Sequence, residues 1–399
     1  MRLLIVSHVI HFRHEGRLYA YGPYVREIDV WAELFPEVMI ASPCRDAVPP
    51  GDCLPFESSN ISIAPQMETG GETWWSKVKL AAATPLMMLG VAREAWRSDA
   101  VHVRCPGNLG LIGTLVAPLF CSRLVAKYAA QWDESADQPW GTRLQKGILR
   151  SRWWRGPVTV YGEWPNQPPH IISFFTSLLT GEMIARARVA AVAPRPASGM
   201  RILYTGRLSK SKNVDTLIRA VAECLRTGRE VTCTVVGDGP EREHLEALSE
   251  SFGAQRAVKF AGAVAFEKVI DHLEQSDALV LVSETEGWPK AIAEAMAFGL
   301  VCVGSDTGFL PRMLDGRGFV VPPGDAEALT KTLFKIYDSP DRCADIRGRA
   351  SEWAQRFSLS GLRDAIRSLL EEKWSVQLGT PVQHRIDKKG TESQWEPSV

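Results

Sequence analysis

The chain has 399 residues, and its 46 Lys and Arg balance its 46 Asp and Glu, so the formal net charge is zero. A neutral chain lacks the broad basic surface of a nucleic-acid-binding protein, so no nucleic-acid partner is expected. Hydrophobic residues make up 45% of the chain, which is ordinary for a folded protein of two or three domains.

The cysteines and the apolar runs indicate where the protein works. Eight cysteines show no C-x-x-C pair and no zinc-like spacing, and several lie in apolar, strand-like runs such as 231–235. Reduced thiols of this kind favour a cytoplasmic protein. The opening run, 1–7, is too short for a signal peptide, and the longest run, 109–121, is shorter than the roughly 20 residues of a membrane-spanning helix.

In the first half of the chain, short apolar runs alternate with helix-like segments, which predicts a doubly wound parallel sheet. The expected strands lie at 2–7, 38–41, 61–64, 100–103, 124–128 and 158–161. A helix is expected over 24–35, and the apolar run 109–121 is interpreted as a buried helix. The Pro-rich stretch 193–199 is typical of a linker.

The second half repeats the alternation more regularly. Its expected strands lie at 201–205, 231–236, 258–260, 278–282, 300–303 and 318–321, and its expected helices at 214–227, 240–252, 266–275, 289–298 and 325–337. A helical run follows over about 342–374, and the polar end of the chain is expected to be disordered.

These elements predict an α/β protein with two Rossmann-like domains facing a central cleft. The expected parts are an acceptor-binding domain at 1–197, a nucleotide-sugar-binding domain at 198–355, a helix at 356–374 that could return to the first domain, and a tail at 375–399.

Three loops in the second half follow strands, where open α/β sheets bind ligands. The first, 204–213, contains Arg207, Lys210 and Lys212, with Asn213 as the expected N-cap of the next helix. Cations beside a helix N-terminus suit a diphosphate, although a solvated loop would have the same composition.

The second loop, 235–241, contains Gly237 and Gly239 but not the third glycine of a dinucleotide fingerprint. Its glycines would let a ligand approach the backbone, and a plain strand-to-helix turn is the alternative.

The third loop and its helix, 283–299, carry two acids. Pro289 suits the helix start and Gly299 its end, so Glu286 lies in the loop and Glu294 inside the helix. Glu294 stands among Ala, Ile, Met and Phe, where burial is unfavourable unless a partner such as a sugar hydroxyl hydrogen-bonds the carboxylate. Exposure to solvent, or a neighbouring cation, is the alternative.

Residues 201–325 resemble the carboxyl-terminal domain of retaining glycosyltransferases of the GT-B type, family 4. The shared motifs are the G-R-L loop with Lys212-Asn213, the V-V-G-D-G-P turn at 235–240, and the two acids Glu286 and Glu294. They occur in the family's order, followed by G-S-D-T-G at 304–308 and V-P-P-G-D at 321–325.

The resemblance implies a donor site built from these motifs. Arg207 and Lys212 would hold the donor diphosphate and, with Glu286 beside the donor sugar, form the catalytic set. Glu294 would bind the ribose, and Gly237 and Val264 would lie near the base. The other donor-site residues implied are Gly287, Trp288, Pro289 and Lys290. No metal and no cofactor are implied, since two cations can stabilise the leaving diphosphate and the sequence has no D-x-D pair.

The first half fits the family less closely. Gly16 and Gly22 are the candidates for its glycine-rich loop. Family members often have a D-x-x-H-x-H segment whose second histidine lies near the transferred sugar. This chain has Arg104 at that position. Arg104 could instead contact a phosphate or the acceptor. His102 is interpreted as a core histidine with its hydrogen bonds satisfied.

The segment 140–157 carries five cations, no acids and several interleaved tryptophans. This composition suits contact with an anionic membrane and a lipid-linked acceptor, or else a surface helix with an apolar inner face.

The predicted function is a retaining glycosyltransferase that moves a sugar from a nucleoside-diphosphate sugar to a saccharide or lipid-linked saccharide, in bacterial surface or exopolysaccharide assembly. A sugar-nucleotide epimerase of the same architecture, an NAD-dependent oxidoreductase and a catalytically inactive sugar-binding protein are the alternatives. A G-x-G-x-x-G motif is missing after 2–7 and 201–205, which argues against the oxidoreductase.

Overall fold

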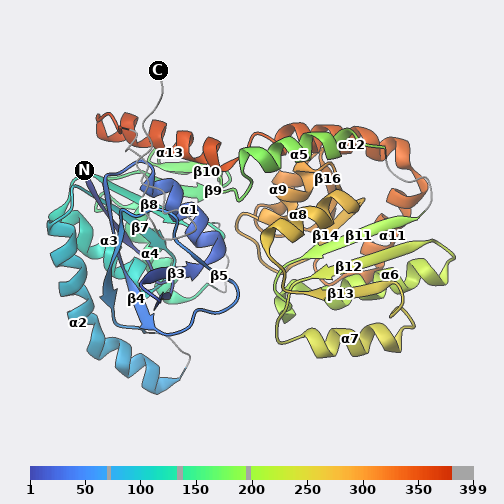
Figure 1. The fold of residues 1–399 in the computed structure, drawn as a ribbon, viewed down its shortest axis with the longest axis horizontal. Helices are drawn as coiled ribbons and strands as arrows, with labels where there is room; N and C mark the ends of the chain where they lie inside the picture. Colours follow the sequence, from blue (N-terminus) through green and yellow to red (C-terminus); the bar gives the residue numbers. More distant parts are fainter. Residues whose placement is uncertain (70–72, 133–137, 195–198, 380–399) are drawn as a thin grey trace. The chain divides into compact units, whose positions relative to one another are not determined.

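The computed structural model describes residues 1–69, 73–132, 138–194 and 199–379, which form two compact units (Figure 1). Unit 1 contains Met1–Leu178 and the chain from Leu359 onward, and unit 2 contains Leu179–Ser358. The expected tail and linker lie mostly outside the described residues. Within these ranges, no helix is long and apolar enough to cross a membrane.

Unit 1 is built on one ten-stranded sheet with the order β10-β9-β8-β7-β1-β4-β2-β3-β5, and β6 also pairs with β4. Its strands are β1 (Arg2–Val6), β2 (His11–His14), β3 (Arg17–Tyr21), β4 (Glu37–Asp46), β5 (Cys53–Pro55), β6 (Ile61–Gln66), β7 (Ala100–Cys105), β8 (Leu124–Tyr128), β9 (Val158–Tyr161) and β10 (Ile171–Phe174). Its helices are α1 (Gly22–Ala32), α2 (Trp74–Trp96), α3 (Asn108–Phe120), α4 (Trp140–Arg150) and α13 (Leu359–Trp374).

Strand β1 shows why helices cover both faces of this sheet. Its side chains alternate, so Leu3 and Ile5 enter one core while Leu4 and Val6 enter the other. The first core includes residues of α1 and α13, and the second includes residues of α2 and α3. The six strands expected in this half correspond to β1, β4, β6, β7, β8 and β9, which pair in parallel.

Four strands, β2, β3, β5 and β10, were not expected from the sequence. Strands β2 and β3 form an antiparallel hairpin whose turn contains Glu15 and Gly16, both in the left-handed region with φ of 49° and 73°. Gly16 therefore serves a hairpin turn, where its conformational freedom is needed. A Cβ built on it would meet nothing within 4 Å.

Unit 2 has a six-stranded, all-parallel sheet with the order β13-β12-β11-β14-β15-β16. The strands are β11 (Met200–Thr205), β12 (Val231–Val236), β13 (Val258–Gly262), β14 (Ala278–Leu281), β15 (Val301–Ser305) and β16 (Gly318–Val321). The helices are α5 (Gly181–Val192), α6 (Val214–Arg226), α7 (Arg242–Ser251), α8 (Phe266–Gln275), α9 (Lys290–Ala297), α10 (Leu310–Leu314), α11 (Ala326–Asp338) and α12 (Pro340–Ala354), with a 3-10 turn at Lys210–Lys212.

The direction of the chain through this sheet fixes where its loops meet. From β11 the chain runs outward to β12 and β13, and it then returns to β14 on the other side of β11. The loops that follow β11 and β14 therefore leave neighbouring strands in opposite directions, at the topological switch point where such sheets bind ligands.

Two boundaries differ from the sequence prediction. Helix α5 precedes the expected boundary at 197–198 but belongs to unit 2, where Arg186 pairs with Asp271 and Glu274 of α8 at 3.0 and 2.8 Å. The expected helical run at 342–374 is two helices, α12 and α13, which belong to different units. At the break between them, the ring of Phe357 packs on Trp353 at 4.7 Å.

Candidate functional site

The centre of the candidate site is an ion pair between the two loops at the switch point of unit 2. Nζ of Lys212, from the loop after β11, lies 2.6 Å from Oε1 of Glu286, from the loop after β14. The side chains are 25% and 13% exposed, so the pair is partly shielded but open to a ligand. A main-chain bond of 2.8 Å, from the N–H of Glu284 to the carbonyl of Ser211, fixes the same two loops to each other.

Asn213 links these loops in a way that the sequence did not predict. It lies at the N-cap position of α6 in the left-handed region (φ 48°), but its side chain makes no capping bond. Its amide nitrogen instead donates to the carbonyl of Val282 at 3.1 Å. The predicted capping role was wrong, because the side chain is used to join the end of β14 to the first loop.

Arg207 supplies the exposed positive charge of the site. Its guanidinium makes no hydrogen bond or ion pair with any residue that the structure describes, and its carbonyl accepts a bond of 3.0 Å from the phenol of Tyr204. Burial, reinforced by the negative charge of Glu286, raises the pKa of Tyr204, so this phenol stays a neutral donor. Tyr204 is thus a support of the loop that the sequence analysis missed, since an apolar strand pattern conceals it.

Gly237 and Gly239 bring the second loop against the first. A Cβ on Gly237 would lie 1.9 Å from the carbonyl oxygen of Gly206, and one on Gly239 would lie 2.2 Å from that of Leu208. The N–H of Gly237 also donates to Gly262 at 2.8 Å, next to the turn that holds Val264. The close approach that these glycines permit is therefore between protein backbones, whereas the sequence analysis assigned it to a ligand.

The predicted residues of the third motif divide between the loop and the core. Pro289 is the N-cap of α9, Lys290 is its first residue and Gly287 lies in the preceding bend. Glu294 lies in the second turn of α9 and is only 6% exposed. The burial of Glu294 is contrary to the solvent-exposed alternative, while its contact with a ribose stays a prediction.

Trp288 lies in an aromatic cluster. Its ring stacks on Phe309 and Trp353 at centroid distances of 5.6 and 6.1 Å and meets Phe357 edge-on at 5.3 Å. Only 8% of the residue is exposed. In the structure Trp288 therefore anchors the loop before α9 rather than presenting its ring to a ligand.

A second support comes from the end of β15, which neighbours β14. The carbonyl of Ser283 accepts bonds from the hydroxyls of Ser305 and Thr307, at 2.5 and 3.1 Å. These bonds fix the chain just ahead of Glu286. In the sequence the G-S-D-T-G segment is visible only as a further family motif, because the partner of Ser305 lies 22 residues away.

The N-terminal candidates do not form a comparable open site. Arg104 is 8% exposed, and its Nη1 lies 2.6 Å from Oε1 of Glu27 in α1, which also pairs with Nζ of Lys127 at 2.8 Å. Burial alone would raise the pKa of Glu27, but Arg104 and Lys127 outweigh it and hold that pKa well below its usual range. Gly22 begins α1, with the side chain of Leu54 3.2 Å from the place of a Cβ.

His102 is buried next to this ion cluster, as expected, but it is not satisfied. Its ring stacks on Trp31 at 4.1 Å, and neither ring nitrogen has a hydrogen-bond partner among the described residues. Burial, reinforced by the charge of Arg104, lowers its pKa well below the usual value, so the imidazole is neutral.

Several side chains of the segment 140–157 are held by hydrogen bonds to the protein. Lys146 donates to Gln138 at 2.9 Å, Trp153 donates to the carbonyl of Thr114 at 3.1 Å, and Arg155 donates to that of Pro118 at 2.8 Å. These contacts are those of a surface segment held against the protein, although Trp140, Leu144 and Trp153 are 77%, 40% and 42% exposed. No group of three or more potential metal ligands (His, Cys, Asp or Glu) occurs in the ranges that the structure describes.

Comparisons with known proteins show what the chain and its fold are similar to. Residues 190–353 match the family model of the glycosyl transferases group 1. The α-D-kanosaminyltransferase of Streptomyces kanamyceticus is 28% identical over 217 residues, which are 52% of this chain and 55% of that protein. The amylovoran biosynthesis glycosyltransferase AmsK of Erwinia amylovora is 30% identical over 145 residues, 34% of this chain and 36% of that protein. The chain thus spans about half, or less, of the length of these curated relatives.

The fold is shared with a solved structure over almost the whole chain. Anabaena HepE in complex with UDP and glucose superposes with a TM-score of 0.64 at 18% identity, covering 92% of this chain and 99% of that one. The two α/β units are therefore those of the GT-B fold class. Residues 190–353, the segment that is similar to the glycosyl transferases group 1, include the whole candidate site.

Proposed function

We propose that the protein is a retaining glycosyltransferase that moves a sugar from a nucleoside-diphosphate sugar to a saccharide or lipid-linked saccharide acceptor. The observation that carries the proposal is the Lys212–Glu286 pair beside the exposed Arg207, at the switch point of a sheet within the family-matched segment. The UDP complex of HepE, which has the same fold, supports a nucleotide-sugar donor.

The chemistry follows from the charges of the two loops. In transfer, the bond between the anomeric carbon and the diphosphate breaks, and its electron pair goes to the diphosphate oxygen. Arg207 and Lys212 would stabilise that charge, together with the N-terminus of α6 that follows Asn213. The two cations and the absence of a D-x-D pair from the sequence support a metal-independent reaction.

Glu286 would then position the donor sugar. Its Oε1 is held by Lys212, which leaves the second carboxylate oxygen to accept hydrogen bonds from sugar hydroxyls. Glu294 is the proposed partner of the ribose. Retention of the anomeric configuration is tested by determining the configuration of the product by NMR.

The setting is proposed to be the cytoplasm and bacterial surface polysaccharide assembly. The eight cysteines are thiols in the structure, which supports a reducing compartment. The similarity to a protein named for amylovoran biosynthesis supports the pathway.

Calorimetric titration with UDP, GDP, ADP, dTDP and NAD tests the donor assignment. We expect one nucleoside diphosphate to bind, and Lys212→Ala to weaken it by about 1.5–3 kcal/mol, the contribution of a charged hydrogen bond. Lys335→Ala, an exposed lysine in the last turn of α11, is the matched control and should bind normally. Binding of NAD alone would overturn the proposal in favour of an oxidoreductase.

Incubation of the donor without acceptor separates transfer from epimerisation. A transferase leaves the sugar nucleotide unchanged or hydrolyses it slowly, whereas an epimerase converts it into a second sugar nucleotide that chromatography resolves. Such a conversion would assign the same site to the epimerase alternative.

A further inference from the structure

Helix α2 is apolar on two opposite faces, and only one of them is buried. The inner face consists of Ala83, Met87, Val91 and Ala95, four residues apart, which lie in the second core of unit 1. The outer face consists of Trp75, Val78, Ala82, Leu86, Leu89, Arg93 and Trp96, at intervals of three or four residues. A helix of a water-soluble domain normally has a polar outer face, so this pattern calls for a partner.

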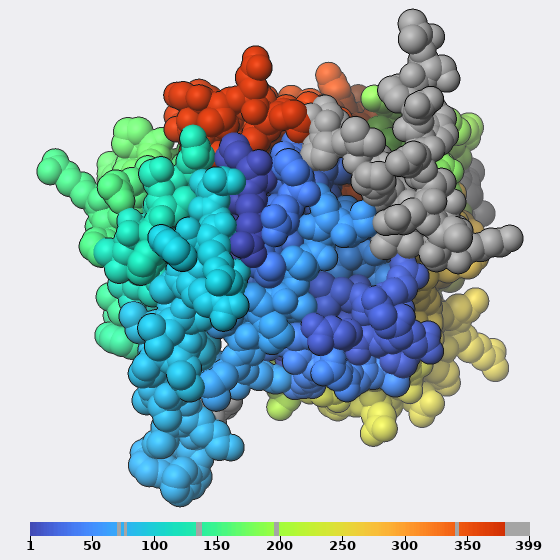
Figure 2. All heavy atoms as spheres, turned by 60° about the vertical axis from the view of Figure 1, so that its left-hand side comes forward, coloured from blue at the N-terminus to red at the C-terminus, as the bar shows by residue number. Residues whose placement is uncertain are grey.

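The large side chains on the outer face of α2 are exposed to solvent. Trp75, Leu86, Leu89 and Trp96 are 67%, 62%, 67% and 73% exposed. The helix has 23 residues, so the stripe is about 34 Å long. Its amino-terminal part, in light blue, stands out from the body of unit 1 (Figure 2). Exposed apolar surface of this extent marks an interaction site.

Helix α3 adds apolar surface beside α2. It packs against α2 and exposes Leu115, Leu119 and Phe120, which are 38%, 63% and 43% exposed. Trp153, held on α3 through its bond to Thr114, is 42% exposed next to them. The apolar surface therefore does not end at the edge of α2.

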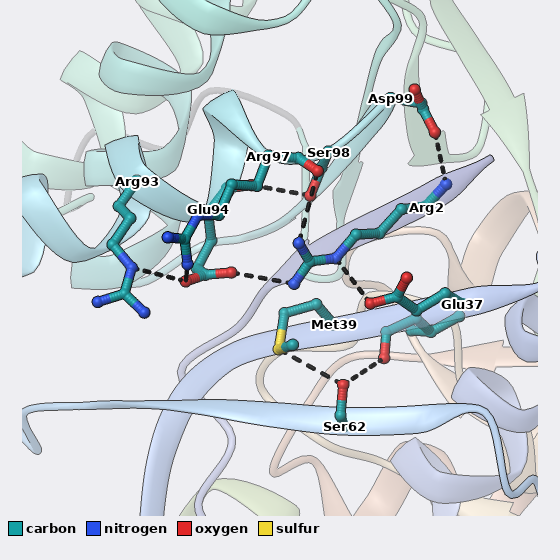
Figure 3. Close-up of polar contacts among 10 residues, drawn as sticks. Arg2, Glu37, Met39, Ser62, Arg93, Glu94, Arg97, Ser98 and Asp99 are labelled. Atoms are coloured by element: carbon teal, nitrogen blue, oxygen red, sulfur yellow. Dashed lines mark hydrogen bonds and ion pairs between the residues drawn. The ribbon is translucent and has the colours of Figure 1, made fainter.

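The exposed charged residues that the structure describes on α2 itself are cations. The single acid of α2, Glu94, is 5% exposed and is bound by Arg2, Arg93 and Arg97 at 3.1, 3.2 and 3.8 Å (Figure 3). Arg93 and Lys79 remain exposed, whereas the sequence of α3 contains no charged residue. The two nearby acids, Glu37 and Asp99, are bound by Arg2 at 2.9 and 2.7 Å. Lys79 and Arg93 therefore give the outer face of α2 a positive charge.

We propose that the outer face of α2 docks on an anionic lipid membrane, with the helix lying in the plane of the surface. Its tryptophans and leucines would enter the boundary between headgroups and acyl chains, while Lys79 and Arg93 contact anionic headgroups. Trp74 and Trp75 at one end and Trp96 at the other suit this boundary, where indole rings concentrate. The inference does not depend on the proposed transfer reaction.

The charge pattern favours a membrane over a second copy of the chain. A symmetric dimer would place this face against itself, so Lys79 and Arg93 would meet cations. Glu94 could not relieve the repulsion, because three arginines already surround it. Anionic lipids would pair with these cations and cover the apolar stripe together.

Vesicle sedimentation with the full chain tests the proposal. We expect the protein to bind phosphatidylcholine vesicles that contain phosphatidylglycerol, and to bind pure phosphatidylcholine vesicles at least about tenfold more weakly. The double variant Leu86→Glu/Leu89→Glu should lose at least about tenfold in partitioning, which corresponds to about 1.4 kcal/mol. Val48→Glu, at a 73% exposed apolar position of the same unit, is the matched control and should bind normally.

A second variant keeps the test valid if the double variant folds poorly. Lys79→Gln leaves the apolar stripe intact and should weaken binding to the anionic vesicles roughly fivefold, the effect of one basic residue at such a surface. Sedimentation independent of anionic lipid, or equal for the wild type and both variants, would overturn the proposal. A dimer that Leu86→Glu/Leu89→Glu dissociates, without vesicle binding, would assign the face to a second copy instead.

The assay contains no sugar nucleotide, so its result is separate from the proposed function. A chain that binds vesicles but no nucleoside diphosphate would leave the docking surface in place and remove the transferase proposal. The reverse result would remove the docking surface alone.

Discussion

Nζ of Lys212 lies 2.6 Å from Oε1 of Glu286, although the two residues are 74 positions apart. The cation that the family resemblance assigns to the diphosphate is therefore already paired with the acid that it assigns to the sugar. A diphosphate that enters the site must share Lys212 with Glu286 or replace it.

Replacing Glu286 should accordingly have opposite effects on binding and on turnover. In Glu286→Gln, Lys212 loses its competing partner, so we expect nucleoside-diphosphate affinity to rise on the order of tenfold, as about 1.4 kcal/mol would give. Turnover should be abolished, because the amide no longer holds the donor sugar. Calorimetry and a transfer assay measure the two effects. Glu284→Gln, an exposed acid of the same loop, is the control, and a near-normal rate in Glu286→Gln would remove the catalytic assignment.

The second loop should not tolerate a side chain at Gly237. Its φ is 139° and a Cβ would lie 1.9 Å from the carbonyl oxygen of Gly206, so Gly237→Ala must separate the two loops. We expect loss of nucleotide binding and lower stability toward urea, beyond the roughly 1–3 kcal/mol of backbone strain alone. Gly228→Ala is the control, because it has the backbone strain (φ 78°) but no atom within 4 Å of the added Cβ. The difference between the two variants therefore measures the steric effect. Equal losses in both variants would contradict the packing argument.

Glu27, Arg104 and Lys127 form a buried ion cluster in unit 1, and their replacement should lower the stability of the protein by different amounts. Glu27→Gln leaves Arg104 and Lys127 buried without a counter-ion, and removal of a buried ionic partner lowers the free energy of unfolding by about 3–5 kcal/mol. Arg104→Met leaves the neutral pair of Glu27 and Lys127, so its cost should be clearly smaller. Urea denaturation compares the two variants. A larger loss in Arg104→Met would mean that Glu27 is not the centre of the cluster.

His102 should make the protein sensitive to mild acid. Its pKa is well below the usual value in the folded state, so below about pH 6.5 the unfolded chain binds a proton that the folded chain excludes. Stability from this group is therefore complete above pH 6.5 and falls as the pH decreases, by up to about 1.4 kcal/mol per pH unit. His102→Leu removes that proton and an unpartnered polar ring. Urea midpoints at pH 7 and pH 5 should differ less in the variant, and an unchanged difference would show that His102 is not responsible.

The order of the elements was largely predictable. In unit 2 the strands β11–β16 follow apolar runs in the sequence, because strands of a parallel sheet are buried on both faces. Helix α9 begins after Pro289 and ends before Gly299, where a left-handed residue was expected. The hairpin β2–β3 was missed, since its short strands mix apolar with charged residues and carry no long apolar run.

Side-chain partners were less predictable. Asn213 has the identity of an N-cap but donates across to Val282, and Trp288 stands in a ligand-site motif but packs on Phe309 and Trp353. Both interactions join segments far apart in the sequence. Local patterns report the backbone conformation of a residue, but they carry no information on which distant group it will meet.

The sequence by itself determined the fold class and the residue types of the site, because burial periodicity and the motifs 207–213, 235–240 and 286–294 are local properties of the chain. Only the tertiary structure decided that Lys212 pairs with Glu286, that Arg104 is enclosed by Glu27, and that the outer face of α2 is left uncovered. Each of these depends on the order of strands in a sheet and on which helix faces another. Those relationships arise from the packing of the whole chain and not from any one segment.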